Sequence, residues 1–155
     1  MGLFGKPWHL ALDRTNWKFG RCHINILMLA IIHQKNCIPL FWVLLDKAGN
    51  SNAKERTGLM AKLNKVFPDQ PIASLSGDRE FIGETWMHWL YKQGIPFVLR
   101  LKENMFIWKE GDVPVKLSAH ARHLKKRQKR ILKGHGIWAE TLKNRQHRLR
   151  LPCCV

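Results

Sequence analysis

Two apolar runs of strand length lie side by side in the first third of the chain, and they constrain the fold more than any other feature. Residues 23–33 and 37–45 are rich in Ile, Leu, Val and aromatic side chains, and only Gln34, Lys35 and Asn36 separate them. A polar connection of this length is typical of a β-hairpin, and neither run is long enough to cross a bilayer. The pattern predicts a pair of adjacent antiparallel strands and no membrane span.

Shorter segments on either side predict three further strands. Residues 8–13 alternate well enough for a strand before the hairpin, and residues 72–78 and 97–102 are short apolar segments after it. The segment at 72–78 runs directly into a helical pattern. These segments place strands on both sides of two expected helices.

The two helices are predicted from capping and periodicity. Asn52 followed by Glu55 three residues later is typical of a helix start, and Pro68 ends that helix. Its apolar face is expected to carry Leu59, Met60, Leu63, Val66 and Phe67. The second helix stops at Gly94, and one side of it is expected to carry Ile82, Trp86, Trp89, Leu90 and Gln93.

The resulting order is β-β-β-α-β-α-β. A three-strand antiparallel meander followed by two strand–helix–strand crossovers makes a mixed α/β sheet with helices on it. The ribonuclease H-like fold has this order, and it is the fold that we expect.

Charge divides the chain near Gly111. The 155 residues contain 27 Lys and Arg against 11 Asp and Glu, a formal net charge of +16, which indicates a polyanionic partner such as nucleic acid. Residues 1–110 have a net charge of +6 and residues 111–155 a net charge of +10. We expect a core domain over 1–110 and a basic appendage over 111–155.

Two structures are compatible with the appendage. Residues 117–133 have the composition of a basic helix. Alternatively, residues 130–133 and 137–140 flank Gly134, His135 and Gly136, which is typical of a hairpin.

Two aspartates lie at the expected ends of strands. Asp13 follows the first strand and Asp78 the fourth, and in this topology the fourth strand lies beside the first. Converging carboxylates are ligands that Mg²⁺ prefers, and phosphoryl transfer commonly uses two such ions. The competing interpretation makes Asp78 a turn residue or a helix N-cap.

The local sequence around both aspartates resembles a known family. LDRTNW at 12–17 and GDREF at 77–81 are similar to the first two catalytic motifs of bacterial DDE transposases of the insertion-sequence-four family. Residues 38–42, 45–52 and 94–100 resemble that family too, so the likeness covers about residues 8–103. The resemblance implies a ribonuclease H-like core, Mg²⁺ or Mn²⁺ as cofactor, transposon ends and target DNA as partners, and a possible homodimer on DNA. Asp13 and Asp78 match its first two metal-binding, catalytic carboxylates.

The third acid of that family has no counterpart motif here. The family places it in a Tyr–Arg–Glu–Lys signature, and the chain's single tyrosine, Tyr91, is not followed by that spacing. We therefore expect a fragment without the third Glu and without the family's N-terminal DNA-binding region, inactive alone, with residues 112–150 opening a β-rich insertion. The acids that remain as candidates are Glu80, Glu84, Glu103, Glu110, Asp112 and Glu140.

Several cationic residues are candidate DNA contacts. Arg14 and Arg79 follow the two aspartates. They either contact phosphate and favour the ionised carboxylates, or each forms a structural ion pair with the carboxylate that the other one follows. A basic segment without interleaved aromatics is expected to bind phosphate and to read charge rather than sequence. Its members are Lys125, Lys126, Arg127, Lys129, Arg130 and Lys133. Trp17, expected in a polar loop after the first aspartate, either stacks on a displaced base or has no such role.

The sequence supports two hypotheses of function, and a third is less favoured. The first is an incomplete transposase core that cleaves and joins DNA. The second is a non-catalytic basic DNA-binding protein that keeps the fold, and the third is another ribonuclease H-like nuclease. Four cysteines without a CxxC spacing, and the absence of a signal-peptide pattern, favour a cytoplasmic protein without a membrane anchor.

Overall fold

The computed structural model describes residues 5–109, 111–132 and 135–138. They form two compact units that separate between Arg100 and Leu101, and each unit is considered by itself. The change in packing thus falls before Leu101, whereas the change in charge falls near Gly111. The division into domains 1–110 and 111–155 stays a prediction.

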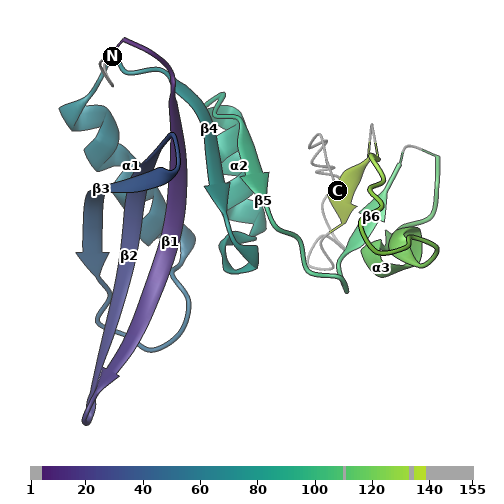
Figure 1. Ribbon diagram of the computed structural model, residues 1–155, viewed down its shortest axis with the longest axis horizontal. Coiled ribbons are helices and arrows are strands. Elements are labelled where there is room, and N and C mark those ends of the chain that lie inside the picture. The colour runs from purple at the N-terminus through teal and green to yellow at the C-terminus, as the bar shows by residue number, and fades with distance from the viewer. Residues whose placement is uncertain (1–4, 110, 133–134, 139–155) are drawn as a thin grey trace. The chain divides into compact units, whose positions relative to one another are not determined.

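The described part of the first unit contains five strands, two α-helices and a short 3-10 turn (Figure 1). They are β1 (Trp8–Phe19), β2 (Cys22–His33), β3 (Asn36–Leu44), α1 (Ala53–Val66), β4 (Ile72–Gly77), the turn η1 (Arg79–Phe81), α2 (Glu84–Lys92) and β5 (Phe97–Leu99).

The five strands form one sheet in the order β3-β2-β1-β4-β5. β1, β2 and β3 are an antiparallel meander, whereas β4 pairs in parallel with both β1 and β5. This is the strand order of the ribonuclease H-like fold, and the predicted fold class is confirmed.

One face of the sheet and the two helices enclose the core. Leu10 and Leu12 on β1 and Leu75 on β4 are at most 3% exposed, while the alternate residues His9 and Asp13 are exposed. Both helices lie behind the sheet in Figure 1 and contact each other. The buried helix residues are Arg56, Leu59, Met60 and Leu63 on α1 and Trp86, Met87 and Leu90 on α2.

One predicted core position on α1 is wrong. Val66 is 55% exposed, because the helix ends there and the chain turns. Phe67 packs inward in its place, with its ring 5.1 Å from that of Trp8 in an edge-to-face arrangement.

β1 is longer than predicted. Asp13 does not close this strand, and Trp17 lies within it rather than in a loop. The strand continues because β2 pairs with it as far as Phe19↔Cys22, where a two-residue turn joins them. Sequence alternation weakens after Asp13 because Arg14 is polar although it is largely buried, and residues 16–19 are exposed on both sides of the strand.

The outer strand β3 is interrupted by an irregularity. Leu29 pairs with Phe41 but Ala30 pairs with Pro39, so that Leu40 is an extra residue. Proline has no N–H to donate, and such residues occur at edges or bulges of sheets.

The second unit has a small antiparallel sheet of order β7-β6-β8. Its elements are β6 (Phe106–Trp108), β7 (Val115–Lys116), α3 (Leu117–Ala121) and β8 (Gly136–Trp138). Ile107, Leu117 and Leu132 form its buried cluster, with Leu101 packed against them.

Both interpretations of the appendage need correction. The helix covers only Leu117–Ala121, because the basic residues that follow have no apolar partners along one side and form turns. Residues 130–132 are not a strand, and β8 pairs with β6 rather than with them. Lys133 and Gly134 lie outside the described residues.

Among the residues that the structure describes, no helix is long and apolar enough to span a membrane.

The start of α1 has the predicted capping box, and the Glu55 carboxylate in it is charged at neutral pH. The Asn52 side chain accepts from the Glu55 N–H at 2.9 Å, and the Glu55 carboxylate accepts from the Asn52 N–H at 2.7 Å and pairs with Lys47 at 2.9 Å. Burial raises the pKa of Glu55, but the hydrogen bonds and charge of Lys47 and the Asn52 N–H outweigh it. The net pKa lies below its ordinary value of 4.5.

We expect Glu55→Gln to lower the free energy of unfolding at neutral pH and to lose this effect in acid. A carboxylate with a lowered folded pKa stabilises the fold above its unfolded pKa and ceases to do so as the pH falls through the folded value. Urea unfolding of both proteins between pH 7 and pH 3 measures this. Asp69→Asn, in an exposed loop, is the control, and a difference independent of pH would contradict the prediction.

Candidate functional site

The register between β1 and β4 brings Asp13 and Asp78 next to each other. The last parallel pair is Leu12↔Gly77, and each aspartate is the following residue on its strand. Asp78 keeps an extended backbone, with φ −76° and ψ 174°. Neighbouring strands lie about 4.8 Å apart, so the two residues stand at the same level of the sheet.

Alternation puts both carboxylates on the face away from the helices. Leu12 points into the core, so Asp13 points to the other side, together with His9. The hydrogen bond of 2.8 Å between His9 Nδ1 and Ser74 Oγ confirms that β1 and β4 share this face. Asp78, four residues after Ser74, continues the same alternation. The site is open to solvent, because both aspartates are exposed.

Asp78 is the turn residue that the competing interpretation expects, because its carbonyl accepts from the Phe81 N–H at 2.9 Å, but its side chain does not act as a cap. Asp78 precedes η1, and its side chain makes no capping hydrogen bond. The only ion pair that it makes with a described residue is a long one of 3.9 Å to Arg100 Nη1, with the two side chains 56% and 73% exposed. An exposed pair at this distance contributes little to stability, so the carboxylate is available to another ligand.

Gly77 allows close packing next to the site. A Cβ at this position would come within 3.0 Å of Phe81 Cδ2 and 3.1 Å of Leu99 Cδ2. Phe81 is fully buried, so these neighbours have little room to move. Because Gly77 has no side chain, the backbone just before Asp78 packs directly against the core.

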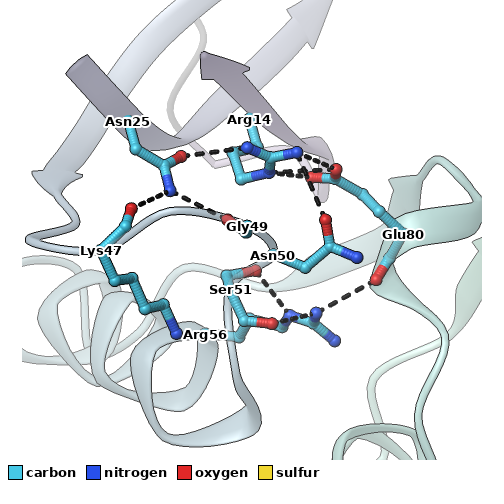
Figure 2. Close-up of polar contacts among 8 residues, drawn as sticks. All are labelled: Arg14, Asn25, Lys47, Gly49, Asn50, Ser51, Arg56 and Glu80. Carbon is cyan, nitrogen blue, oxygen red and sulfur yellow. Dashed lines mark hydrogen bonds and ion pairs between the residues drawn. The ribbon is translucent and has the colours of Figure 1, made fainter. Parts of the chain in front are cut away.

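A polar network anchors the ends of β1 and β4 on the core side of the sheet (Figure 2). Arg14 Nε donates to both oxygens of Glu80 at 3.0 Å, and its Nη2 lies 2.9 Å from Oε2. The remaining guanidinium donors reach Asn25 Oδ1 at 3.1 Å and Asn50 Oδ1 at 3.3 Å. The two charged side chains are only 13% and 20% exposed. Arg14 follows Asp13 and Glu80 lies two residues after Asp78, so this ion pair ties together the two segments that carry the aspartates.

Two members of the network were not predicted from the sequence. Asn25 is 2% exposed and donates from Nδ2 to the carbonyls of Lys47 and Gly49 at 3.0 and 2.9 Å. Its position inside an apolar run is the signal that could have revealed it, because a buried amide requires partners.

Arg56 is the other unpredicted residue. It is 4% exposed, donates to Ser51 Oγ and to the Glu80 carbonyl, and lies over the Phe81 ring at 5.2 Å. Burial lowers the pKa of this guanidinium, and the nearby carboxylates of Glu80 and Glu55 oppose that shift. No sequence signal distinguishes it from a solvated helix residue.

The charged residues that follow the two aspartates differ in their contacts. Arg14 forms a structural ion pair, but its partner is Glu80 and not the expected Asp78, and each of its guanidinium nitrogens donates at least one hydrogen bond. Glu80 is therefore engaged as well. Arg79 is exposed on η1, and Glu84 begins α2.

Most of the basic segment is exposed. Residues 121–130 are all accessible, and Arg130 donates from Nη1 to the His120 carbonyl at 3.1 Å. Lys133 lies outside the described residues. The exposure leaves Lys125, Lys126, Arg127 and Lys129 available to an anion.

The described residues supply no third ligand beside the two aspartates. They contain no group of three or more His, Cys, Asp or Glu side chains that could hold a metal ion. Glu103 and Asp112 belong to the second unit, and Glu110 and Glu140 lie outside the described residues. Two neighbouring carboxylates suit a hard divalent cation, but within the described part of the chain they are an incomplete ligand set.

Comparison with known proteins identifies the class. A family model described as transposase DDE domain matches residues 4–149, and the chain belongs to this family. A search of curated proteins gives no match.

Solved structures give distant matches. A chain of the simian T-cell lymphotropic virus intasome with PP2A regulatory subunit B56 gamma is 10% identical, with a TM-score of 0.48 over 65% of this chain and 36% of that one. The HTLV-2 integrase catalytic core domain with magnesium is 10% identical in its dimeric form, with a TM-score of 0.44 over 59% of each chain. In its trimeric form the identity is 11% and the TM-score 0.46, over 64% of this chain and 63% of that one. The chain therefore spans less than two thirds of the length of these structures.

We expect Arg14→Gln and Glu80→Gln each to lower the free energy of unfolding by about 2 kcal/mol. Each change leaves a largely buried charge without its partner, which costs more than the pair contributes. The double variant should recover part of the loss, as urea unfolding at neutral pH would show. Arg79→Gln, an exposed cation on the adjacent turn, should stay within about 0.5 kcal/mol of the wild type. Full stability of Arg14→Gln would contradict the anchoring role.

Proposed function

We propose that this chain is a DNA transposase catalytic core of the insertion-sequence-four type, which binds DNA and a divalent cation. The observation that carries the proposal is the register pairing that sets Asp13 beside Asp78 on an exposed face. The membership of the transposase DDE domain family supports it. The motifs around the two aspartates support the finer assignment to the insertion-sequence-four type.

Asp13 and Asp78 are the residues that would hold the cation. Both are exposed carboxylates at one level of two neighbouring strands, and oxygen ligands are what Mg²⁺ and Mn²⁺ take. When bound, such ions stabilise charge on the attacking and leaving oxygens of a phosphodiester. Arg100 near Asp78 adds a positive charge where a DNA phosphate would approach.

The ion pair of Arg14 with Glu80 gives the site its rigidity. Arg14 follows Asp13 on β1 and so points to the opposite face, where the pair is largely buried and does not occupy the face of the aspartates. The role of the pair is to keep the two strand ends together before a cation binds. A site held in place in this way loses less entropy on binding than a flexible one.

DNA contact is assigned to the basic segment. Five of its six cations lie in the described residues and are exposed. When such side chains neutralise DNA phosphates, counterions are released. The affinity of the chain for DNA should therefore fall steeply as the salt concentration rises.

The alternative is a non-catalytic DNA-binding protein with the same fold. The specific observation in its favour is the absence of a third acid beside Asp13 and Asp78 among the described residues. Two carboxylates alone should hold Mg²⁺ loosely, because this ion requires near-octahedral coordination and keeps its waters. We propose that the chain by itself binds metal weakly and does not cut or join DNA at a useful rate.

We expect weak Mn²⁺ binding that Asp13→Asn and Asp78→Asn each reduce about tenfold or more, since each removes one of two ligands. Titration calorimetry with Mn²⁺ measures the affinity, and nicking of supercoiled DNA tests activity. Asp69→Asn, which makes the same charge change on an exposed loop before β4, is the matched control.

Two results would contradict this prediction in different ways. Equal Mn²⁺ affinity of the wild type and Asp13→Asn would overturn the ligand assignment. Robust nicking that Asp13→Asn abolishes would overturn the proposed inactivity and would direct attention to Glu140 or Glu110 as the missing acid.

We expect that replacing the six cations of the basic segment by Gln weakens binding to duplex DNA and flattens its salt dependence. Each phosphate that is no longer neutralised should lower the slope of log affinity against log salt by about 0.9. Fluorescence anisotropy over a salt series measures the slope. Replacing three exposed lysines of α1 (Lys54, Lys62 and Lys65) by Gln shows the effect of removing half as much charge elsewhere on the chain. An unchanged slope in the sixfold variant would exclude the segment as the main DNA-binding surface.

A further inference from the structure

The hairpin of β1 and β2 extends beyond the rest of the sheet. β3 pairs with β2 only as far as Leu44↔Ile26, and β4 pairs with β1 only as far as Gly77↔Leu12. The pairs from Trp17↔Ile24 to Phe19↔Cys22 therefore form a two-stranded projection, visible in Figure 1 where the two longest strands run past their neighbours. We name residues 17–24 the β1–β2 arm.

The tip of the arm is a tight turn. Gly20 and Arg21 are its two central residues, and Gly20 has φ +59°. Arg21 has no positive φ, and a two-residue hairpin turn with a positive φ at the first central position alone is of type II′, which favours glycine there. Such a turn continues the twist of both strands and holds the side chains beside it in fixed directions.

The arm exposes two aromatic side chains on one face. Trp17 is 61% and Phe19 is 80% exposed. They alternate with Lys18, and the pairing of β1 with β2 has no register shift between Asp13 and Phe19. Both rings therefore lie on the same side of the sheet as the Asp13 carboxylate.

The charge of the arm fits a polyanion. Lys18 and Arg21 are exposed, and residues 14–45 contain no Asp or Glu. Exposed aromatic rings beside cations, without any acid, are the composition of surfaces that bind unpaired nucleic acid, where rings stack on bases and cations contact phosphates. A protein–protein interface would not require that all the charged residues of the region be positive.

We propose that the β1–β2 arm binds DNA near the reacting phosphodiester, with Trp17 and Phe19 stacking on unpaired bases and Arg21, at the turn, contacting phosphate. This rests on the proposed function, because it takes the phosphodiester to lie at Asp13 and Asp78. Four and six residues separate Asp13 from Trp17 and Phe19, or about 13 and 20 Å along a strand. With about 3.4 Å per nucleotide along one DNA strand, the rings would meet bases roughly four and six nucleotides away.

The first test compares matched tryptophans. Trp17→Ala should weaken binding to a DNA fork with unpaired bases about tenfold, and binding to the full duplex much less. Trp42→Ala is the control, because Trp42 is also 61% exposed and lies on the same face, through the pairs Asp13↔Met28 and Met28↔Trp42, but on β3. It should change neither affinity more than about twofold. Arg21→Gln should lower the slope of log affinity against log salt by about 0.9 if its phosphate is no longer neutralised.

The second test uses two native cysteines. Cys22 is exposed at the tip of the arm, and Cys37 is exposed at the far end of the sheet. In a Cys153→Ser, Cys154→Ser background, a DNA fork with a disulfide-tethered base should exchange faster with Cys22 than with Cys37. The thiolate attacks the tether disulfide, forms the protein–DNA disulfide and releases the small thiol.

Failure of the arm assignment and failure of the proposed function give different experimental results. Reduced fork affinity in Trp17→Ala together with preferred cross-linking at Cys22 supports the proposal. Unchanged fork affinity in Trp17→Ala, with binding still dependent on the basic segment, overturns the arm assignment and leaves the proposed function intact. A changed oligomeric state with unchanged DNA affinity also overturns it, in favour of contact with a second copy. No DNA binding by the wild type overturns both.

Discussion

The ion pair between Arg14 and Glu80 is the interaction on which the site depends. The carboxylate accepts from the guanidinium through both oxygens, and both side chains are largely withdrawn from water. β1 and β4 are about sixty residues apart in sequence, and their parallel pairing stops one residue before the two aspartates. The pair and the amides around it therefore continue the connection between the strands where backbone pairing ends.

One face of the sheet packs in the core, and the other face carries the polar residues that meet solvent. On one side Leu10, Leu12 and Leu75 form a core with the helices, and on the other the polar residues His9, Ser74 and the two aspartates meet solvent. Because successive residues of a strand alternate in direction, each strand end contributes an anchor on one face and, in our proposal, a metal ligand on the other. Arg14 is the anchor that follows Asp13, and stability and chemistry can thus be changed by separate substitutions one residue apart.

The strand order was predictable because it depends on patterns that local sequence contains. Apolar runs, the Asn52–Glu55 capping box and the glycine after α2 mark elements, and right-handed crossovers restrict how they connect. The pair of aspartates followed from the order of strands. Asn25 and Arg56 did not, because their partners include backbone carbonyls far along the chain, which no local pattern identifies. The shortness of α3 was not predicted either, since helix propensity in residues 122–130 has no packing to support it.

The irregularity in β3 limits how the sheet could grow. Pro39 offers no donor, and the extra residue Leu40 displaces the donors beside it. At the opposite edge, β5 has only three residues. A strand from another chain would find few aligned groups at either edge. Association between copies by continuous sheet pairing is therefore disfavoured at both outer strands, which protects an exposed, aromatic-rich sheet from forming edge-to-edge aggregates.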